Sequence, residues 1–443
     1  MNRVATNLPV VDASAYMEAR IRGRDTAVHA ARLSASIMDA CHTFGLFYLV
    51  GHGIDTLLME DVLKETAAFF ACSEEEKLAI SIKNSPHFRG YGILKNYRDW
   101  REQIHLGIEC ERTSGETRAW TQTFEHETEA KYWQLWGPNQ WPHSRRGPFR
   151  QTMEAYFSAI EDLSRTLLEL LAEALDRPTN YFSSRMFDRP YLLMKAMSYL
   201  PQDEQGSEKQ QEQQEQQEQQ EQQEQQEQQE PQEKQQQQQN KPQTKPQTKQ
   251  QNKQQNKQQN KQQNKQQDEQ QDTGYVSTKQ MGVTAHCDWS WITFLLQDDV
   301  GGLEAQNLHG DWTEVHPLKD SLIVNTGELL EIETGGFLRA SPHRVINDRI
   351  DRQRYSVPVF INPALDAPIL PAGKFLLNGS GEGPNCAWRD RCAGADSAID
   401  SATHVHKVVN DGTTMAPFIF GDSEWERKVE AKWCFRQECI DAL

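Results

Sequence analysis

Residues 285–296 read AHCDWSWITFLL, and this stretch sets both the fold and the chemistry of the chain. Its second half is a short run of Trp, Ile, Thr, Phe and Leu, which is typical of a buried strand. Alternate side chains of a strand point to opposite faces, so His286 and Asp288 are predicted to share one face, with Cys287 on the other. We expect Trp289 and Trp291 to lie on the face of Cys287 and to pack in the core.

A second histidine, His343 in ASPHRVIN, lies in a segment well beyond His286 in the chain. A His and a carboxylate on one face supply two metal ligands, and a third from a distant strand leaves about half of an octahedron open. That arrangement is associated with non-haem iron(II) oxygenases, because the open positions can take a 2-oxo acid and O2. His286, Asp288 and His343 are therefore the candidate metal ligands and catalytic residues, although an HxD pair alone also occurs on ordinary exposed strands.

Arg354 and Ser356, in RQRYSVPVF, repeat the same spacing shortly after His343. On a strand they would share a face, where a guanidinium fork and a hydroxyl suit a carboxylate. An exposed edge strand would carry the same pair without any function. The order of these residues after the His and Asp favours an anion site.

The parts of the chain before position 180 and after position 190 differ in composition and in the spacing of their apolar residues. After position 190, short segments rich in Val, Ile, Phe, Thr and Trp are separated by Gly, Asp, Asn and Pro at short and regular intervals. This regular spacing of short strand-like segments predicts an antiparallel sandwich or barrel, with a jelly roll as one option. The part of the chain before position 180 is expected to be mainly helical, because apolar positions recur at helical spacing in 25–43, 56–71 and 149–176. Ser73 and Glu76 form a capping-box pattern.

Residues 202–272 are almost entirely Gln, Glu, Lys and Asn, with Glu at every third position from Glu212 to Glu230. Such a segment cannot offset its ordering entropy by burying apolar side chains, so we expect a disordered insert extruded between two strands. The alternative is a segment that mediates weak association. The chain that remains without the insert is still long enough for one sizeable core.

The formal net charge is −17, and the insert, with 14 acidic and 9 basic residues, accounts for only −5 of it. An acidic body repels phosphate backbones and anionic membranes, so we expect neither nucleic acid nor a membrane as partner. No apolar run approaches the roughly 18 residues of a membrane span. Eight scattered cysteines without a CxxC pair, and no signal-peptide pattern at the start, predict free thiols in the cytoplasm.

Several segments of the chain match a known family. They are LPVVD, ACHTFGLFYLVGHGI, FRGY, REQIHLGIE and GPNQWP before the insert, and HCDWSWITFLLQDDVGGLEAQN, GDWTEVHPLKDSLIVNTGELLEIETGG, SPHRV and RYSVPVFINP after it. Through these segments the chain resembles, from residue 8 to about 365, the isopenicillin N synthase-like family of iron(II) and 2-oxoglutarate-dependent dioxygenases.

The resemblance implies a mainly β fold with a helical N-terminal part (α+β) around a double-stranded β-helix, or jelly-roll, core. The implied domains are a helical dioxygenase domain at 1–185 and a catalytic jelly roll at 186–370, interrupted by the insert. Residues 371–443 would pack on that core as a C-terminal segment.

The resemblance also assigns roles. His286, Asp288 and His343 would bind Fe(II), and Arg354 with Ser356 would bind the distal carboxylate of 2-oxoglutarate. Tyr199 resembles the family's co-substrate tyrosine, although Leu200 stands where many members have Pro. The implied reaction uses O2, releases succinate and CO2, and oxidises a small organic metabolite by hydroxylation, desaturation or ring closure. Ascorbate would be a supporting reductant.

Two alternatives remain at this point. An oxidase like isopenicillin N synthase itself would use iron and O2 without 2-oxoglutarate, and Arg354 with Ser356 would then hold a substrate carboxylate. A catalytically idle jelly-roll scaffold would associate through the Gln-rich insert. The histidines outside the candidate ligand set are expected to be structural or exposed: His52, His105, His309 and His316.

Overall fold

A computed structural model describes residues 8–95, 99–109, 135, 137–186, 191–200, 281–307, 309–334, 336–347, 352–364 and 367. The chain divides into two units, Met1–Pro201 with Met281–Leu443 and Gln202–Gln280. Only the first unit contains described residues. The predicted insert 202–272 and the C-terminal segment 371–443 lie outside them, and the predicted boundary at 185 stays a prediction.

The larger sheet has eight strands in the order β1-β2-β10-β7-β12-β5-β4-β3. All neighbours pair antiparallel except β1 and β2. The strands are β1 (Val10–Asp12), β2 (Leu46–Val50), β3 (Gly90–Lys95), β4 (Trp100–Gly107), β5 (Leu192–Tyr199), β7 (Ile292–Gln297), β10 (Ser321–Thr326) and β12 (Arg354–Ile361).

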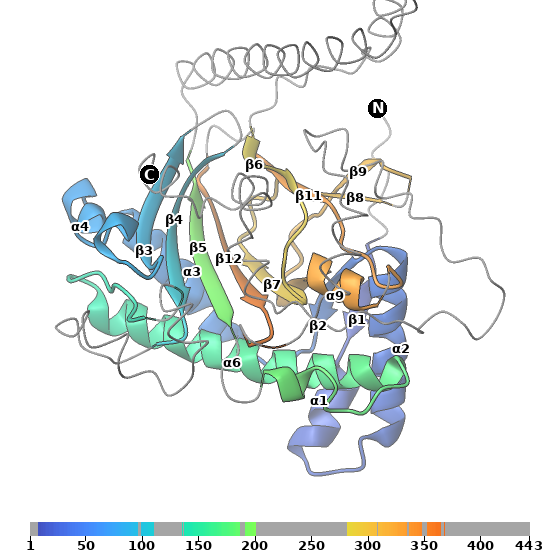
Figure 1. Cartoon of the computed structure of the whole chain (residues 1–443). Helices are drawn as coiled ribbons and strands as arrows, with labels where there is room; N and C mark the ends of the chain where they lie inside the picture. Colours follow the sequence, from blue (N-terminus) through green and yellow to red (C-terminus); the bar gives the residue numbers. More distant parts are fainter. Residues whose placement is uncertain are drawn as a thin grey trace, which may run out of the picture. The chain divides into compact units, whose positions relative to one another are not determined.

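The smaller sheet has four antiparallel strands in the order β6-β11-β8-β9. They are β6 (Met281–His286), β8 (Leu303–Gln306), β9 (Trp312–Glu314) and β11 (His343–Ile346). Met197 and Tyr199 of the larger sheet share a buried cluster with Leu303 and Val345 of the smaller one. The two sheets therefore enclose apolar side chains between them, as in the jelly roll predicted from the strand rhythm (Figure 1).

The helices are α1 (Ser14–Ile21), α2 (Ala27–Thr43), α3 (Thr56–Phe70), α4 (Glu74–Ala79), α6 (Arg146–Ala174) and α9 (Glu328–Glu333), with short 3₁₀ turns at Ile82–Asn84 and Ser183–Arg185. The longest, α6, buries an apolar stripe that includes Phe149, Met153, Tyr156 and Ile160. It packs against α2 and α3 and runs beside the larger sheet (Figure 1). These helices cover the larger sheet on the side away from the smaller one, and so close the main apolar core.

The helix boundaries follow local signals. Asp55 begins α3 by accepting a hydrogen bond from the backbone N–H of Leu57, and Ser73 begins α4 by accepting one from that of Glu76. The expectation of a mainly helical N-terminal part is confirmed, and this part also contributes β1 to β4 to the larger sheet. The sheet that builds the site is thus shared by both halves of the chain.

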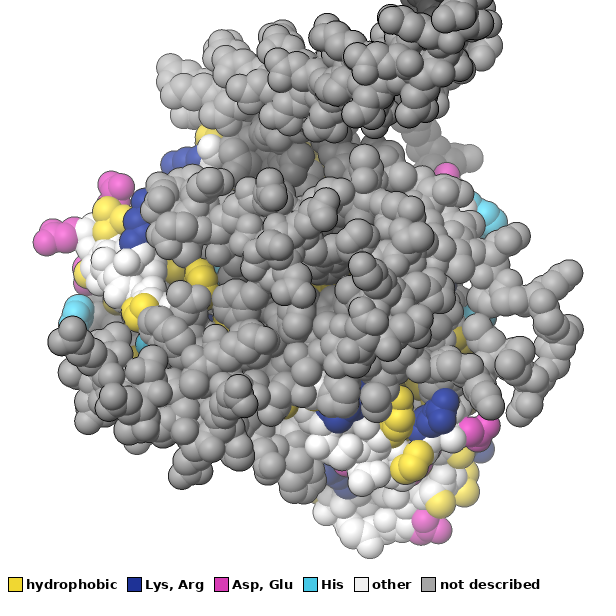
Figure 2. Space-filling view, in the orientation of Figure 1, with side chains coloured by type: hydrophobic (Ala, Val, Ile, Leu, Met, Phe, Trp, Pro, Cys, Tyr) yellow, Lys and Arg dark blue, Asp and Glu magenta, His cyan; other side chains and the backbone are white. Residues whose placement is uncertain are grey.

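The surface shown in Figure 2 mixes side-chain types. At the end formed by α1 and α2, hydrophobic side chains are interspersed with acidic and basic ones. Exposed large hydrophobics such as Ile21 and Val28 are therefore scattered rather than gathered into a patch. Among the described residues, no helix has the length and apolar character needed to cross a membrane.

Candidate metal and 2-oxo acid site

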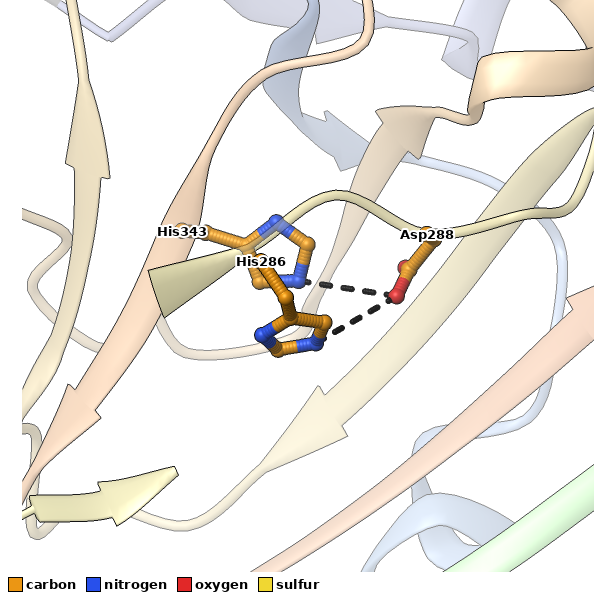
Figure 3. A group of neighbouring side chains, drawn as sticks. All are labelled: His286, Asp288 and His343. Carbon is orange, nitrogen blue, oxygen red and sulfur yellow. Dashed lines mark ion pairs between the residues drawn. The ribbon is translucent and has the colours of Figure 1, made fainter. Parts of the chain in front are cut away.

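Two strands of the smaller sheet and one turn bring three ligand-type side chains together. His286 ends β6, His343 begins β11, and the two residues are direct cross-strand partners. Asp288 follows two residues after the end of β6, and its Oδ1 lies 3.6 Å from Nε2 of His286 and 3.7 Å from Nε2 of His343 (Figure 3). The ligand atoms of all three lie within 4.8 Å of one another, which suits a single metal ion.

The position of Asp288 corrects one prediction. His286 and Asp288 were expected to share the face of one strand, but β6 ends at His286 and Asp288 lies beyond it. The backbone carbonyl of Asp288 accepts a 2.7 Å hydrogen bond from the N–H of Glu328, at the start of α9. This contact helps to hold the turn that directs the carboxylate toward the two imidazoles, so a turn and not strand parity joins the pair.

Each imidazole is fixed in one tautomer. Nδ1 of His286 lies 2.9 Å from the carbonyl oxygen of Thr284, and Nδ1 of His343 lies 2.9 Å from that of Ser341. A carbonyl oxygen only accepts, so Nδ1 must carry the hydrogen in both rings. The lone pairs of both Nε2 atoms are left for a metal, which is the usual arrangement of metal-binding histidines.

Asp288 is only 3% exposed, yet it is held as a carboxylate. Burial by itself would raise its pKa, but the imidazoles of His343 and His286 and the amide of Asn325 outweigh burial and hold the pKa below its usual value. Burial lowers the pKa of His343, which keeps that imidazole neutral and able to bind a metal. Two imidazole nitrogens and one carboxylate form the mixed donor set that fits iron(II) with positions left open.

Asn325 is a site residue that the sequence analysis did not single out. It lies in β10, and its Nδ2 donates a 2.8 Å hydrogen bond to Oδ2 of Asp288. Ile323 and Asn325 both line the cavity beside the candidate metal ligands. The alternation in SLIVNT carried this signal, because it places the two residues on one face.

Arg354 and Ser356 lie on one face of β12, as their spacing predicted. Arg354 is 1% exposed, and its Nη2 donates a 2.9 Å hydrogen bond to Oε1 of Gln297. Its Nε and Nη1 are buried without a hydrogen-bond partner, which is costly unless an anion completes the site. The buried guanidinium therefore fits a carboxylate ligand.

Tyr199 lies beside this pair. Its hydroxyl is 3.3 Å from Oγ of Ser356, and the Arg354 guanidinium stacks over its ring at 4.6 Å. Tyr199 is also the cross-strand partner of Arg354 in the sheet. All three side chains are almost completely buried, so they form a rigid wall.

Both groups of residues line one cavity with about 610 Å3 of empty space, a volume that includes part of the open solvent at its mouth. Its lining includes all six predicted site residues: His286, Asp288, His343, Arg354, Ser356 and Tyr199. It also includes two cationic residues, Arg101 and Lys195, that the sequence analysis did not single out. A metal at one end and an anion at the other would thus share one cavity.

The residues expected to be structural do not line this cavity. Trp291 is fully buried and Trp289 packs against the main core cluster, as predicted. Among the histidines, His52 and His105 are buried, whereas His309 and His316 are exposed.

Two family profiles match the chain. The one described as non-haem dioxygenase in morphine synthesis N-terminal covers residues 8–144, and the one described as the 2OG-Fe(II) oxygenase superfamily covers residues 254–363.

Curated relatives are similar over most of their length. A probable iron/ascorbate oxidoreductase of Dictyostelium discoideum is 25% identical over 378 residues, covering 82% of this chain and 83% of that protein. A homoarginine-6-hydroxylase of Arabidopsis thaliana is 26% identical, covering 83% and 80%. A 2-oxoglutarate-dependent dioxygenase of Monascus ruber is 26% identical, covering 84% and 89%.

Solved structures share the fold. A full-length Neurospora crassa protein crystallised in complex with alpha-KG and thymine superposes with a TM-score of 0.56 at 18% identity, covering 84% of this chain and 91% of that one. A 2OG-Fe(II) oxygenase family protein of Caulobacter crescentus gives 0.55 at 17% identity, covering 92% and 100%. The solved structures show the shared fold, and the two profiles with the curated relatives show that the chain belongs to the iron(II) and 2-oxoglutarate-dependent oxygenases.

Proposed function

We propose that the protein oxidises a small organic metabolite, with iron(II) bound by His286, Asp288 and His343 and 2-oxoglutarate bound between that metal and Arg354. One observation carries the proposal. A two-histidine, one-carboxylate donor set and a buried guanidinium with two unpartnered donor atoms line the same cavity. This is what a co-substrate with a metal-binding oxo acid at one end and a carboxylate at the other requires.

In this proposal the protein's own residues position the reactants. The carbonyls of Thr284 and Ser341 orient the two imidazoles, and Asn325 orients Asp288, so no rearrangement is needed when the metal binds. The bound iron(II) supplies the centre at which O2 and the 2-oxo acid react, with succinate and CO2 as products. Arg354 and Ser356 hold the distal carboxylate, which fixes how the co-substrate lies across the cavity.

The test measures the release of labelled CO2 from 2-oxoglutarate that carries the label at C1. Protein supplied with iron(II) and ascorbate is screened in this way against a metabolite library. His343→Ala serves as the blank. We expect release that is stimulated by particular metabolites and absent from the variant. Turnover of a substrate without CO2 release would contradict the proposal and favour an oxidase of the isopenicillin N synthase type.

We also propose that the enzyme works in the cytoplasm and that the segment 202–272 is accessory to catalysis. Cys41 and Cys72, both among the described residues, are free thiols, which supports a reducing compartment. Deleting the segment should leave iron binding and CO2 release unchanged. Loss of both would show that the insert takes part in the fold or the site.

A further inference from the structure

The guanidinium of Arg354 has one hydrogen-bond partner among the described residues, and this partner is neutral. Nη2 of Arg354 donates a 2.9 Å hydrogen bond to Oε1 of Gln297. Gln297 ends β7 and is the cross-strand neighbour of Ser356, so it lies beside the anion end of the cavity. It does not line the cavity itself. Any effect of Gln297 on a ligand there would therefore pass through Arg354.

The amide of Gln297 has a fixed orientation. A guanidinium only donates hydrogen bonds, so the amide must present its oxygen to Arg354. Its Nε2 is buried and has no hydrogen-bond partner, which is unfavourable. A glutamate would accept the same hydrogen bond with no donor left over. Hydrogen bonding alone therefore does not explain why a glutamine supports Arg354.

The nearest carboxylate along the chain is directed elsewhere. Asp298 accepts hydrogen bonds from the backbone N–H of Tyr355 at 2.6 Å and from that of Val300 at 3.0 Å. Within the described part of the chain, no carboxylate forms an ion pair with Arg354, whose guanidinium contacts a neutral amide and an aromatic ring. Its positive charge is therefore not cancelled by direct contact with an acid.

We propose that Gln297 is a positioning residue that makes the site select a co-substrate with a charged distal group. Its amide holds the guanidinium in place and leaves the positive charge for the ligand, whereas a carboxylate at this position would compete with the ligand. This inference rests on the proposed function, which assigns Arg354 to the distal carboxylate of 2-oxoglutarate.

The experiment compares Gln297→Glu with Gln297→Leu by calorimetric titration of iron-loaded, oxygen-free protein. The ligands are 2-oxoglutarate and its 5-methyl ester, in which the distal group is neutral. Glutamate keeps the acceptor but cancels the charge, so the Kd for 2-oxoglutarate should rise about 10- to 100-fold while the Kd for the ester hardly changes. Leucine removes the acceptor but adds no charge. The Kd for 2-oxoglutarate should then rise less than about 10-fold, and the preference for 2-oxoglutarate over the ester should remain.

A purely structural role for Gln297 predicts the opposite order, because glutamate can still accept from Arg354 and leucine cannot. Iron content is measured on the same samples, and both variants should bind iron as wild type does. Gln151→Glu, at an exposed glutamine on α6, introduces the same charge at a residue that does not line the cavity. This control should bind both ligands as wild type does.

Three results would overturn the inference: an unchanged preference for 2-oxoglutarate over the ester in Gln297→Glu, weaker binding of 2-oxoglutarate by the leucine variant than by the glutamate variant, or loss of iron from Gln297→Glu. Arg354→Met is titrated alongside. If Arg354→Met loses affinity for 2-oxoglutarate and Gln297→Glu does not, the inference on Gln297 fails and the proposed function stands. If Arg354→Met binds 2-oxoglutarate as wild type does, the proposed function fails as well.

Discussion

The two ends of the cavity are built in opposite ways. At the metal end, both imidazoles and the carboxylate have partners inside the protein, in Thr284, Ser341 and Asn325. At the anion end, Arg354 is as deeply buried as Asp288, but its Nε and Nη1 have no partner. In the proposed function, the metal ligands are therefore arranged before the metal binds, whereas the anion end is completed only by a ligand.

This difference predicts what substitutions do. Changes at the metal end should act on the metal first and on the co-substrate as a consequence. Changes at the anion end should act on the co-substrate and leave the metal in place.

The largest effect is expected from His343→Ala. One of three ligands is removed, and since loss of an outer partner alone typically weakens metal binding about 10- to 100-fold, loss of a ligand should exceed that. Iron content after gel filtration should fall from one ion per chain to nearly none, and CO2 release should stop. His316→Ala, at an exposed histidine, is the control. Full iron retention in His343→Ala would remove this residue from the ligand set.

Arg354→Met should raise the KM for 2-oxoglutarate about 100-fold, because the carboxylate loses a buried charged partner. Arg354→Lys should have a KM for 2-oxoglutarate between those of wild type and Arg354→Met, since lysine keeps the charge but lacks the forked guanidinium. Both variants should retain iron, which separates the two ends of the cavity. Arg352→Met, at a half-exposed arginine paired with Asp299, is the matched control. Loss of iron together with 2-oxoglutarate would break the contrast between the ends.

Asn325→Ala should weaken iron binding about 10-fold, because Asp288 loses the donor that orients it. Competition with a chelator gives the iron affinity, and the KM for 2-oxoglutarate at saturating iron should change little. An unchanged chelator titration would mean that the turn alone orients the carboxylate.

Tyr199→Phe should have the smallest effect, a rise in the KM for 2-oxoglutarate of about threefold or less. The hydroxyl makes two neutral contacts, 3.3 Å to Oγ of Ser356 and 3.8 Å to Sδ of Met197, while the ring that stacks under Arg354 is kept. Gly282→Ala tests the ring of Tyr199 instead of its hydroxyl. The new Cβ would lie 2.6 Å from Cδ1 of that ring and would displace the ring. A Phe variant as impaired as Arg354→Met would make the hydroxyl itself a main co-substrate ligand.

The anion end was predictable from sequence because strand alternation is local. Arg354 and Ser356 share a face of β12 wherever that strand packs. The path of Asp288 was not predictable in this way, because its turn depends on a contact with α9, which lies far along the chain. Its closeness to His343 followed from the family resemblance rather than from periodicity.

Strand β4 shows a second feature that could not be predicted from the sequence. Arg101, Glu102 and Gln103 are polar but buried, so no apolar alternation marks the strand. Partners that are distant in sequence make their burial possible, as when Nζ of Lys77 and the hydroxyl of Tyr91 each contact Oε1 of Glu102 at 2.7 Å. Polar pairing of this kind is set by the tertiary structure.

The central claim is that one molecule of 2-oxoglutarate spans both ends of the cavity. Calorimetric titration of 2-oxoglutarate into oxygen-free protein tests it, with and without iron(II), in wild type and in Arg354→Met. We predict one binding site per chain in iron-loaded wild type, weakened at least about 10-fold both by removing the metal and by the substitution. Equal affinity with and without iron, or in wild type and Arg354→Met, would contradict the account.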